Sequence, residues 1–129
     1  MSSRSWQPVD LGGNVPPPKG AYSRAIRAAN LVFISGQVPR DPVTGALEGD
    51  DIETQAAAVF DNVRRTLAAA GASLDDVVSV TVWLSDMANW DRFDAVYRTM
   101  FRAPYPTRTT VGAQLHGVLV EITAIAALD

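Results

Sequence analysis

The hydrophobic and polar positions along the chain follow two periods, a two-residue period typical of β-strands and a longer one typical of helices. Alternating or β-branched runs predict strands at 22–28, 31–38, 77–84, 108–111 and 118–126. The first two runs predict a hairpin, because only Ala29 and Asn30 separate them and Asn tolerates the positive φ of a tight turn.

Between residues 51 and 70 the apolar positions recur at helical spacing, which predicts a long helix with one buried stripe. Asp50 with Glu53 three residues later resembles a capping box at the start of this helix. Gly71 can adopt the left-handed conformation that ends it.

A second helix is predicted to begin at Asn89, a favourable N-cap residue, and to end before Pro104 and Pro106. Its apolar residues share one face: Trp90, Phe93, Tyr97, Met100 and Phe101. Strands and helices then follow one another in the order β-β-α-β-α-β-β, which predicts an α+β fold with two helices packed on one face of a sheet. We expect another subunit to cover the opposite face, whose strands are also apolar.

Composition and charge narrow the class of protein. The chain has 129 residues, 47% of them hydrophobic, which predicts one domain over 1–129, with residues 1–20 as an extended arm rich in Gly and Pro. The net charge of −3 lacks the basic footprint of nucleic-acid binding. Without cysteine and with only His116 as histidine, the sequence predicts no metal site. No run is long enough to span a membrane, so a cytoplasmic protein is expected.

Two charged residues lie in otherwise apolar strand-like runs, Arg108 in 105–111 and Glu121 in 118–126. Charges in such runs are normally paired or functional. If the two strands pair, then Arg108, Thr110 and Glu121 could line one small cleft that binds a carboxylate. A structural ion pair between Arg108 and Glu121, or two surface charges, explains the pattern at least equally well.

Other candidates are weaker on their own. Asp94 lies beside the apolar stripe of the second helix and favours a surface carboxylate, and His116 favours an exposed turn residue. Ser35 and Gly36 close a strand, where Gly permits either the close approach of a ligand or a β-bulge.

An ordered set of motifs resembles the Rid family, also called YjgF-like proteins. The motifs span about residues 22–126 and lie at 20–23, 35–39, 69–71, 81–84, 105–111 and 120–126. The resemblance implies a chorismate-mutase-like subunit that assembles as a homotrimer with clefts between subunits. It further implies a cofactor-free deaminase of 2-enamine and 2-imine acids, acting on small 2-imino acids and releasing 2-oxo acids.

Residue by residue, the resemblance implies that Arg108 holds the substrate carboxylate and that Glu121 attends the water or the leaving nitrogen. Cleft-lining positions match Tyr22, Ser35 and Gly36. The chain departs from the family pattern at three positions and in a shorter loop at 112–117: it has Thr110 for the usual Cys, Asp94 for the usual Asn and Ala21 for the usual Pro.

These departures keep alternative functions open. One alternative is a deaminase of a larger amino-enoic acid such as aminomuconate. Another is a non-catalytic trimer that binds a small carboxylate or another protein, which Thr110 and Asp94 favour. The ribonuclease activity attached to some relatives is disfavoured by the acidic charge balance.

Overall fold

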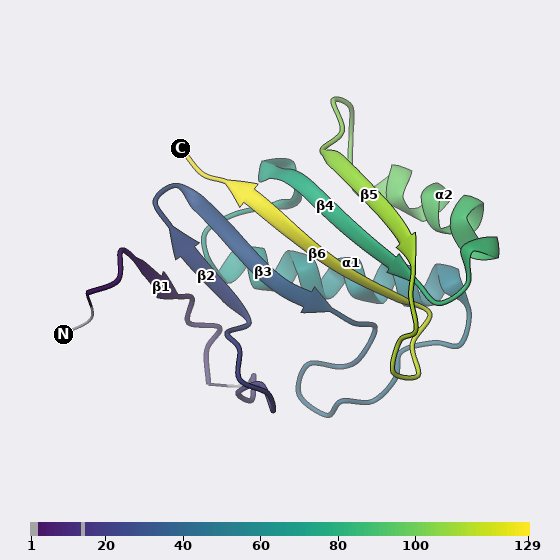
Figure 1. The fold of residues 1–129 in the computed structure, drawn as a ribbon, viewed down its shortest axis with the longest axis horizontal. Helices are drawn as coiled ribbons and strands as arrows, with labels where there is room; N and C mark the ends of the chain where they lie inside the picture. Colours follow the sequence, from purple (N-terminus) through teal and green to yellow (C-terminus); the bar gives the residue numbers. More distant parts are fainter. Residues whose placement is uncertain (1–2, 14) are drawn as a thin grey trace.

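Six strands form one mixed sheet in the computed structural model, which describes residues 3–13 and 15–129. The sheet order is β1-β2-β3-β6-β4-β5, in which only β4 and β5 run parallel (Figure 1). The strands are β1 (Trp6–Pro8), β2 (Ala25–Ala28), β3 (Leu31–Gln37), β4 (Val77–Leu84), β5 (Thr107–Gly112) and β6 (Val120–Ala127). The fifth strand is therefore an edge strand, and β4 separates it from β6.

Two helices cover one face of this sheet, α1 (Ile52–Ala69) and α2 (Trp90–Met100), as Figure 1 shows. Short 3-10 turns lead into β4 (η1, Leu74–Asp76) and into α2 (η2, Met87–Asn89). The predicted α+β class and the two helices on one face are confirmed. The helices found in the described residues are too short or too polar to cross a membrane.

The core lies between the helices and the sheet. An aromatic cluster joins the two helices, with the ring of Phe60 from α1 lying 5.7 to 6.1 Å from three rings near α2: Phe93, Tyr97 and Phe101. The strands contribute alternate residues, so Val120 and Ile122 of β6 are almost fully buried. Glu121, which lies between them, points to the opposite face, and no helix within residues 3–13 and 15–129 covers that face. The prediction that another subunit covers this open face stays a prediction.

The helix ends agree with the sequence except at one cap. Asp51, and not the expected Asp50, is the N-cap of α1, because its carboxylate accepts a hydrogen bond from the Thr54 backbone N–H at 2.7 Å. Gly71 has a φ of +79°, as expected for a left-handed helix stop. Asn89 precedes α2 as predicted but makes no side-chain cap, and the preceding turn is capped by Asp86 instead.

One local prediction is wrong, and one strand is additional to the predicted set. In the hairpin between β2 and β3, the positive φ of 53° is found at Ala29 and not at Asn30, whose side chain instead donates to the Leu128 carbonyl. The N-terminal arm is not wholly without regular structure, because Trp6–Pro8 pair with β2 at the edge of the sheet. Residues 1, 2 and 14 of that arm lie outside the described residues.

Candidate functional site

Arg108 points toward the helix-covered face of the sheet. Side-by-side residues of neighbouring strands point to the same face, and Arg108 pairs with Val80 while Thr110 pairs with Val82, both of which are buried under the helices. Arg108 and Thr110 therefore share the face of β5 that looks toward α2. The sequence predicted that these two residues share a face but did not identify which one.

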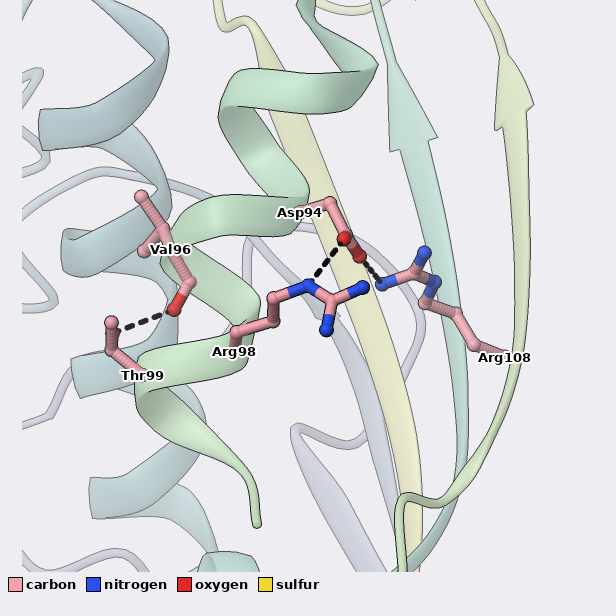
Figure 2. A network of polar contacts seen from close by, with 5 residues as sticks. All are labelled: Asp94, Val96, Arg98, Thr99 and Arg108. Carbon is pink, nitrogen blue, oxygen red and sulfur yellow. Dashed lines mark hydrogen bonds and ion pairs between the residues drawn. The ribbon is translucent and has the colours of Figure 1, made fainter. Parts of the chain in front are cut away.

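Helix α2 surrounds the Arg108 guanidinium with one carboxylate and two rings. Arg108 Nη1 donates to Asp94 Oδ1 at 2.8 Å (Figure 2), and the guanidinium carbon lies 4.5 Å from the Tyr97 ring centre and 5.2 Å from that of Trp90. The three α2 residues follow the spacing i, i+4, i+7, which places them on one helix face. Only 18% of the Arg108 side chain is exposed, so the cation is fixed in a partly dry setting.

Asp94 bridges two arginines. Its second oxygen, Oδ2, accepts from Arg98 Nε at 2.9 Å, as Figure 2 shows. Burial acts to raise the pKa of Asp94, but the hydrogen bonds from Arg108 and Arg98 outweigh burial and hold that pKa below its usual value. Asp94 is therefore ionised at neutral pH and is not the plain surface carboxylate that its position in the sequence favoured.

Two polar groups beside this cation have no hydrogen-bond partner among the residues that the structure describes. In the described part of the chain, Tyr97 Oη and Thr110 Oγ1 are both buried and neither makes a hydrogen bond. Burial raises the pKa of Tyr97 to about 12, more than the nearby positive charge of Arg108 lowers it, so the phenol stays protonated. The spacing of Tyr97 predicts a place in the apolar stripe of the second helix, and no pattern in the sequence indicates its contact with Arg108.

Glu121 lies on the open face of the sheet. It pairs with Trp83 of β4, and both side chains alternate with buried residues that face the helices. The carboxyl group lines a pocket of about 460 Å³ whose wall also includes Arg40 and His116. Burial raises the pKa of Glu121, and the smaller effect of His116 opposes that rise. His116 is exposed, as its position in a turn predicted, but it lies in the same pocket as the acid.

Gly36 lies against the Glu121 carboxylate. A β-carbon built at Gly36 would fall 2.9 Å from Glu121 Cδ and would collide with Oε2. The pairing of β3 with β6 shifts register between Ile34 and Gln37, so the β-bulge considered from the sequence is present at this point. The bulge and the glycine together allow the acid to lie flat on the backbone of β3.

Tyr22 and Ser35 line a neighbouring groove. This groove, of about 620 Å³, runs over β2 and β3 and also contacts Trp6 and Phe33. The Ser35 hydroxyl donates to the Ser23 carbonyl at 2.5 Å, and the residue Tyr22 is 55% exposed. Tyr22 is therefore available to a ligand or to a neighbouring protein surface.

The predicted site residues thus form two groups. Arg108, Asp94 and Thr110 lie between β5 and α2, whereas the open face carries the others: Tyr22, Ser35, Gly36 and Glu121. A single cleft built by Arg108, Thr110 and Glu121 of one chain is ruled out, because β4 separates the two strands and the side chains point to opposite faces. The alternative ion pair between Arg108 and Glu121 is also wrong, since Arg108 pairs with Asp94.

No group of three or more His, Cys, Asp or Glu residues in the described ranges, 3–13 and 15–129, is arranged to hold a metal ion. The chemistry that these groups can supply is binding of an anion by a fixed guanidinium and proton transfer by a partly buried carboxyl group. Both are consistent with reactions of small organic acids.

Known proteins resemble this chain over almost its whole length. A family described as Endoribonuclease L-PSP matches residues 12–128. A RutC family protein from Pyrococcus horikoshii is 44% identical over 115 residues, covering 88% of this chain and 91% of its own. Reactive Intermediate Deaminase A from Arabidopsis thaliana is 38% identical over 88% of this chain and 62% of its own. The E. coli TdcF structure with bound serine has a TM-score of 0.85 at 32% identity, covering 95% and 99% of the two chains.

Proposed function

Because the chain belongs to the Endoribonuclease L-PSP family, whose motifs are those of the Rid (YjgF-like) proteins, we propose that it hydrolyses reactive 2-enamine and 2-imine acids without a cofactor. The products are a 2-oxo acid and ammonia. One similar protein carries the name reactive intermediate deaminase, and the structure of another contains serine, a small amino acid. The first name supports deamination as the reaction, and the bound serine supports a small carboxylic acid as the substrate class.

The observation that carries the proposal is the hydrogen bonding of the Arg108 guanidinium. Its Nη1 donates to Asp94, while Nε and Nη2 have no acceptor among the described residues. These two nitrogens form one edge of the planar guanidinium and match the two oxygens of a carboxylate. A charge-assisted pair of this kind contributes about 1.5 to 3 kcal/mol in a partly dry site.

Glu121 supplies the proton chemistry. The carboxylate accepts a proton from water as the water oxygen bonds to the carbon of the protonated imine, and the C=N electron pair moves to the nitrogen, which becomes a neutral amine. Glu121 then returns this proton to the amine, the C–N bond breaks with its electron pair leaving on ammonia, and the hydroxyl proton passes to Glu121 or to water as the 2-oxo acid forms. Burial makes Glu121 a stronger base than an exposed glutamate, because its pKa is raised.

Assembly would bring the two groups together. Arg108 and Glu121 cannot meet within one protomer, whereas β5 is an edge strand and the sheet has an uncovered face. A homotrimer that places the open face of one protomer beside β5 of the next would form each cleft from two chains. In such a cleft Tyr22, Ser35 and Gly36 would line the wall beside Glu121.

A coupled assay tests the activity. A threonine dehydratase generates 2-iminobutanoate, and 2-oxobutanoate release is followed with wild type, with Arg108→Ala and without the protein. The wild type should accelerate release, and Arg108→Ala should remove most of that acceleration, on the order of 100-fold, because the anchoring pair is lost.

A matched arginine serves as control. Arg64 on α1 pairs with Asp61 at the surface, and Arg64→Ala should leave the rate unchanged. Equal release with and without the wild-type protein would contradict the proposed activity. Loss of activity in both arginine variants would show that the assay measures general damage and not loss of the anchor.

A second candidate function is a non-catalytic receptor for a small carboxylate. Asp94 already accepts a hydrogen bond from one nitrogen of Arg108, which favours weak, reversible binding of a carboxylate over tight binding. Stabilisation of the wild type by 2-oxobutanoate in thermal unfolding, together with no acceleration of imine hydrolysis, would support this function. Turnover in the coupled assay would exclude it as the sole function.

A further inference from the structure

Asp94 places a negative charge directly beside the guanidinium proposed to anchor the substrate. Only 14% of the Asp94 side chain is exposed, and its pKa is lowered by the hydrogen bonds it accepts. Of its two cationic partners, Arg98 is 67% exposed, so water and salt screen the charge of Arg98 more than that of the buried pair. The site therefore presents a fixed positive pole and a fixed negative pole next to each other.

Both poles keep capacity for a ligand. Arg108 uses Nη1 for Asp94 and retains the edge formed by Nε and Nη2. Each Asp94 oxygen accepts one hydrogen bond, whereas an ionised carboxylate offers about four lone-pair sites. A small molecule with a carboxylate next to a cationic nitrogen can satisfy both poles, while a simple anion satisfies one and is repelled by the other.

We propose that the Arg108–Asp94 pair forms a site selective for α-zwitterions, in which Arg108 binds the carboxylate and Asp94 binds the adjacent positively charged nitrogen. This inference rests on the proposed function and specifies its substrate class. The ligand is the protonated form of a 2-imino acid, whose iminium nitrogen is attached to the carbon beside the carboxylate. The 2-oxo acid product has no such cation, so Asp94 repels it and favours its release.

Asp94 also positions Arg108. The carboxylate holds Nη1 on the face of α2 where the Trp90 and Tyr97 rings flank the guanidinium, which orients the opposite edge toward the ligand. Replacement by Asn keeps an acceptor oxygen of the same size but removes the charge. Comparison of wild type with Asp94→Asn therefore separates the effect of the negative charge of Asp94 on ligand binding from the effect of its hydrogen bond to Arg108.

The test uses two unreactive probes of the same carbon skeleton, (S)-2-aminobutanoate and (S)-2-hydroxybutanoate, with binding measured by titration calorimetry. Wild type should bind the amino acid about tenfold more tightly than the hydroxy acid. Asp94→Asn should bring the two affinities to about the same value, by weakening the amino acid and strengthening the hydroxy acid. Equal ratios in wild type and Asp94→Asn, or no measurable binding of the amino acid by wild type, would overturn the inference.

Two further variants keep the test independent of folding. Asp91→Asn removes an exposed carboxylate from the same helix and should keep the wild-type ratio. Arg98→Gln leaves Asp94 in place and removes its exposed cation, so it should raise the preference for the amino acid. A lower preference in Arg98→Gln would contradict the inference.

Failure of the inference and failure of the proposed function are distinguishable, because the probes do not react. Imine hydrolysis without zwitterion preference would refute the role of Asp94 alone. Zwitterion preference without hydrolysis would refute the deaminase and leave the site as a binding site for amino acids.

Discussion

The Arg108 region and the Glu121 region are both partly buried charged groups on a sheet, yet their surroundings are opposite. Arg108 has a carboxylate at 2.8 Å and two aromatic rings, so its charge is compensated and its position is fixed. Glu121 makes no ion pair within the described residues, and burial raises its pKa. The contrast supports the proposal that Arg108 binds the substrate and that Glu121 transfers protons.

The largest expected effect on the imine hydrolysis rate comes from two inactive variants, one without Arg108 and one without Glu121, that are combined in the same trimer. Arg108→Ala and Glu121→Ala should each be inactive as pure proteins, if both residues serve the proposed reaction. In trimers assembled from an equal mixture, a cleft shared by neighbours is intact when one chain supplies Arg108 and the next supplies Glu121. This occurs in about one quarter of clefts for random mixing and closed symmetry.

The measurement is the imine hydrolysis rate after the two variants are denatured together and refolded. Refolding each variant alone is the control and should restore nothing. Activity near one quarter of wild type supports clefts shared between chains. No recovery in refolded mixed oligomers would contradict shared clefts. Because Arg108 and Glu121 cannot meet within one protomer, that result would show that the two residues do not serve the same cleft.

Gly36→Ala should act on the Glu121 region alone. The added β-carbon would collide with the Glu121 carboxylate, so the acid must move, and a displacement of about 1 Å in a reacting group can cost on the order of 100-fold in rate. Binding of 2-aminobutanoate through Arg108 should be less affected than turnover.

Gly13→Ala is the matched control for that substitution. A β-carbon at Gly13 meets no atom of the described residues within 4 Å, so the rate of Gly13→Ala should equal that of wild type. Equal activity of wild type and Gly36→Ala would show that Glu121 need not hold its observed position.

The same two regions show what the sequence could and could not predict. The periodicity of apolar residues predicted the strands and helices, because burial of one face repeats at fixed intervals along the chain. The strand predicted at 77–84, for example, has the same first and last residues as β4. Alternation also showed that Arg108 and Thr110 share a face. It could not show which face, because this depends on β5 pairing in parallel with β4 and not with β6, a long-range contact that no local pattern records.

Other misses have local causes. The pairing of Trp6–Pro8 with β2 was missed because three residues are too few to show a period. Ala29 takes the positive φ although Asn30 is the better residue for it, so the register of the hairpin overrides local preference. The sequence could not predict the contact of Asp94 with Arg108, because a carboxylate at the border of an apolar stripe can face either solvent or a neighbouring strand.

The two carboxyl groups should respond to pH in opposite directions. The pKa of Asp94 is lowered in the folded protein, so its contribution to stability is present above the ordinary value of 3.8 and is lost as the pH falls through its folded pKa. Asp94→Asn should therefore lower the free energy of unfolding at pH 7, by about 1.5 kcal/mol, and the loss should shrink in acid.

The pH dependence of stability that Glu121 contributes has the opposite sign to that of Asp94. Its pKa is raised in the folded protein, so the free energy of unfolding falls as the pH rises from the ordinary value of 4.5 through the folded pKa. Glu121→Gln should increase stability at pH 7, by about 1 kcal/mol, and the gain should vanish at pH 4. Denaturant unfolding at both pH values measures each change. Shifts of the same sign for the two variants would contradict the contrast between the two regions.

Thr110→Val carries the smallest expected effect and probes the Arg108 region. The Thr110 hydroxyl is buried without a hydrogen-bond partner in the described residues of the protomer, and Val has nearly the same shape without the polar atom. The substitution should raise the free energy of unfolding by about 1 kcal/mol, because an unsatisfied buried group is removed. Thr109→Val, at the neighbouring exposed position of the same strand, is the control for β-propensity and should change stability less. If Thr110→Val instead lowers stability while Thr109→Val does not, the hydroxyl has a partner outside the protomer, and the cleft beside Arg108 is completed by another chain.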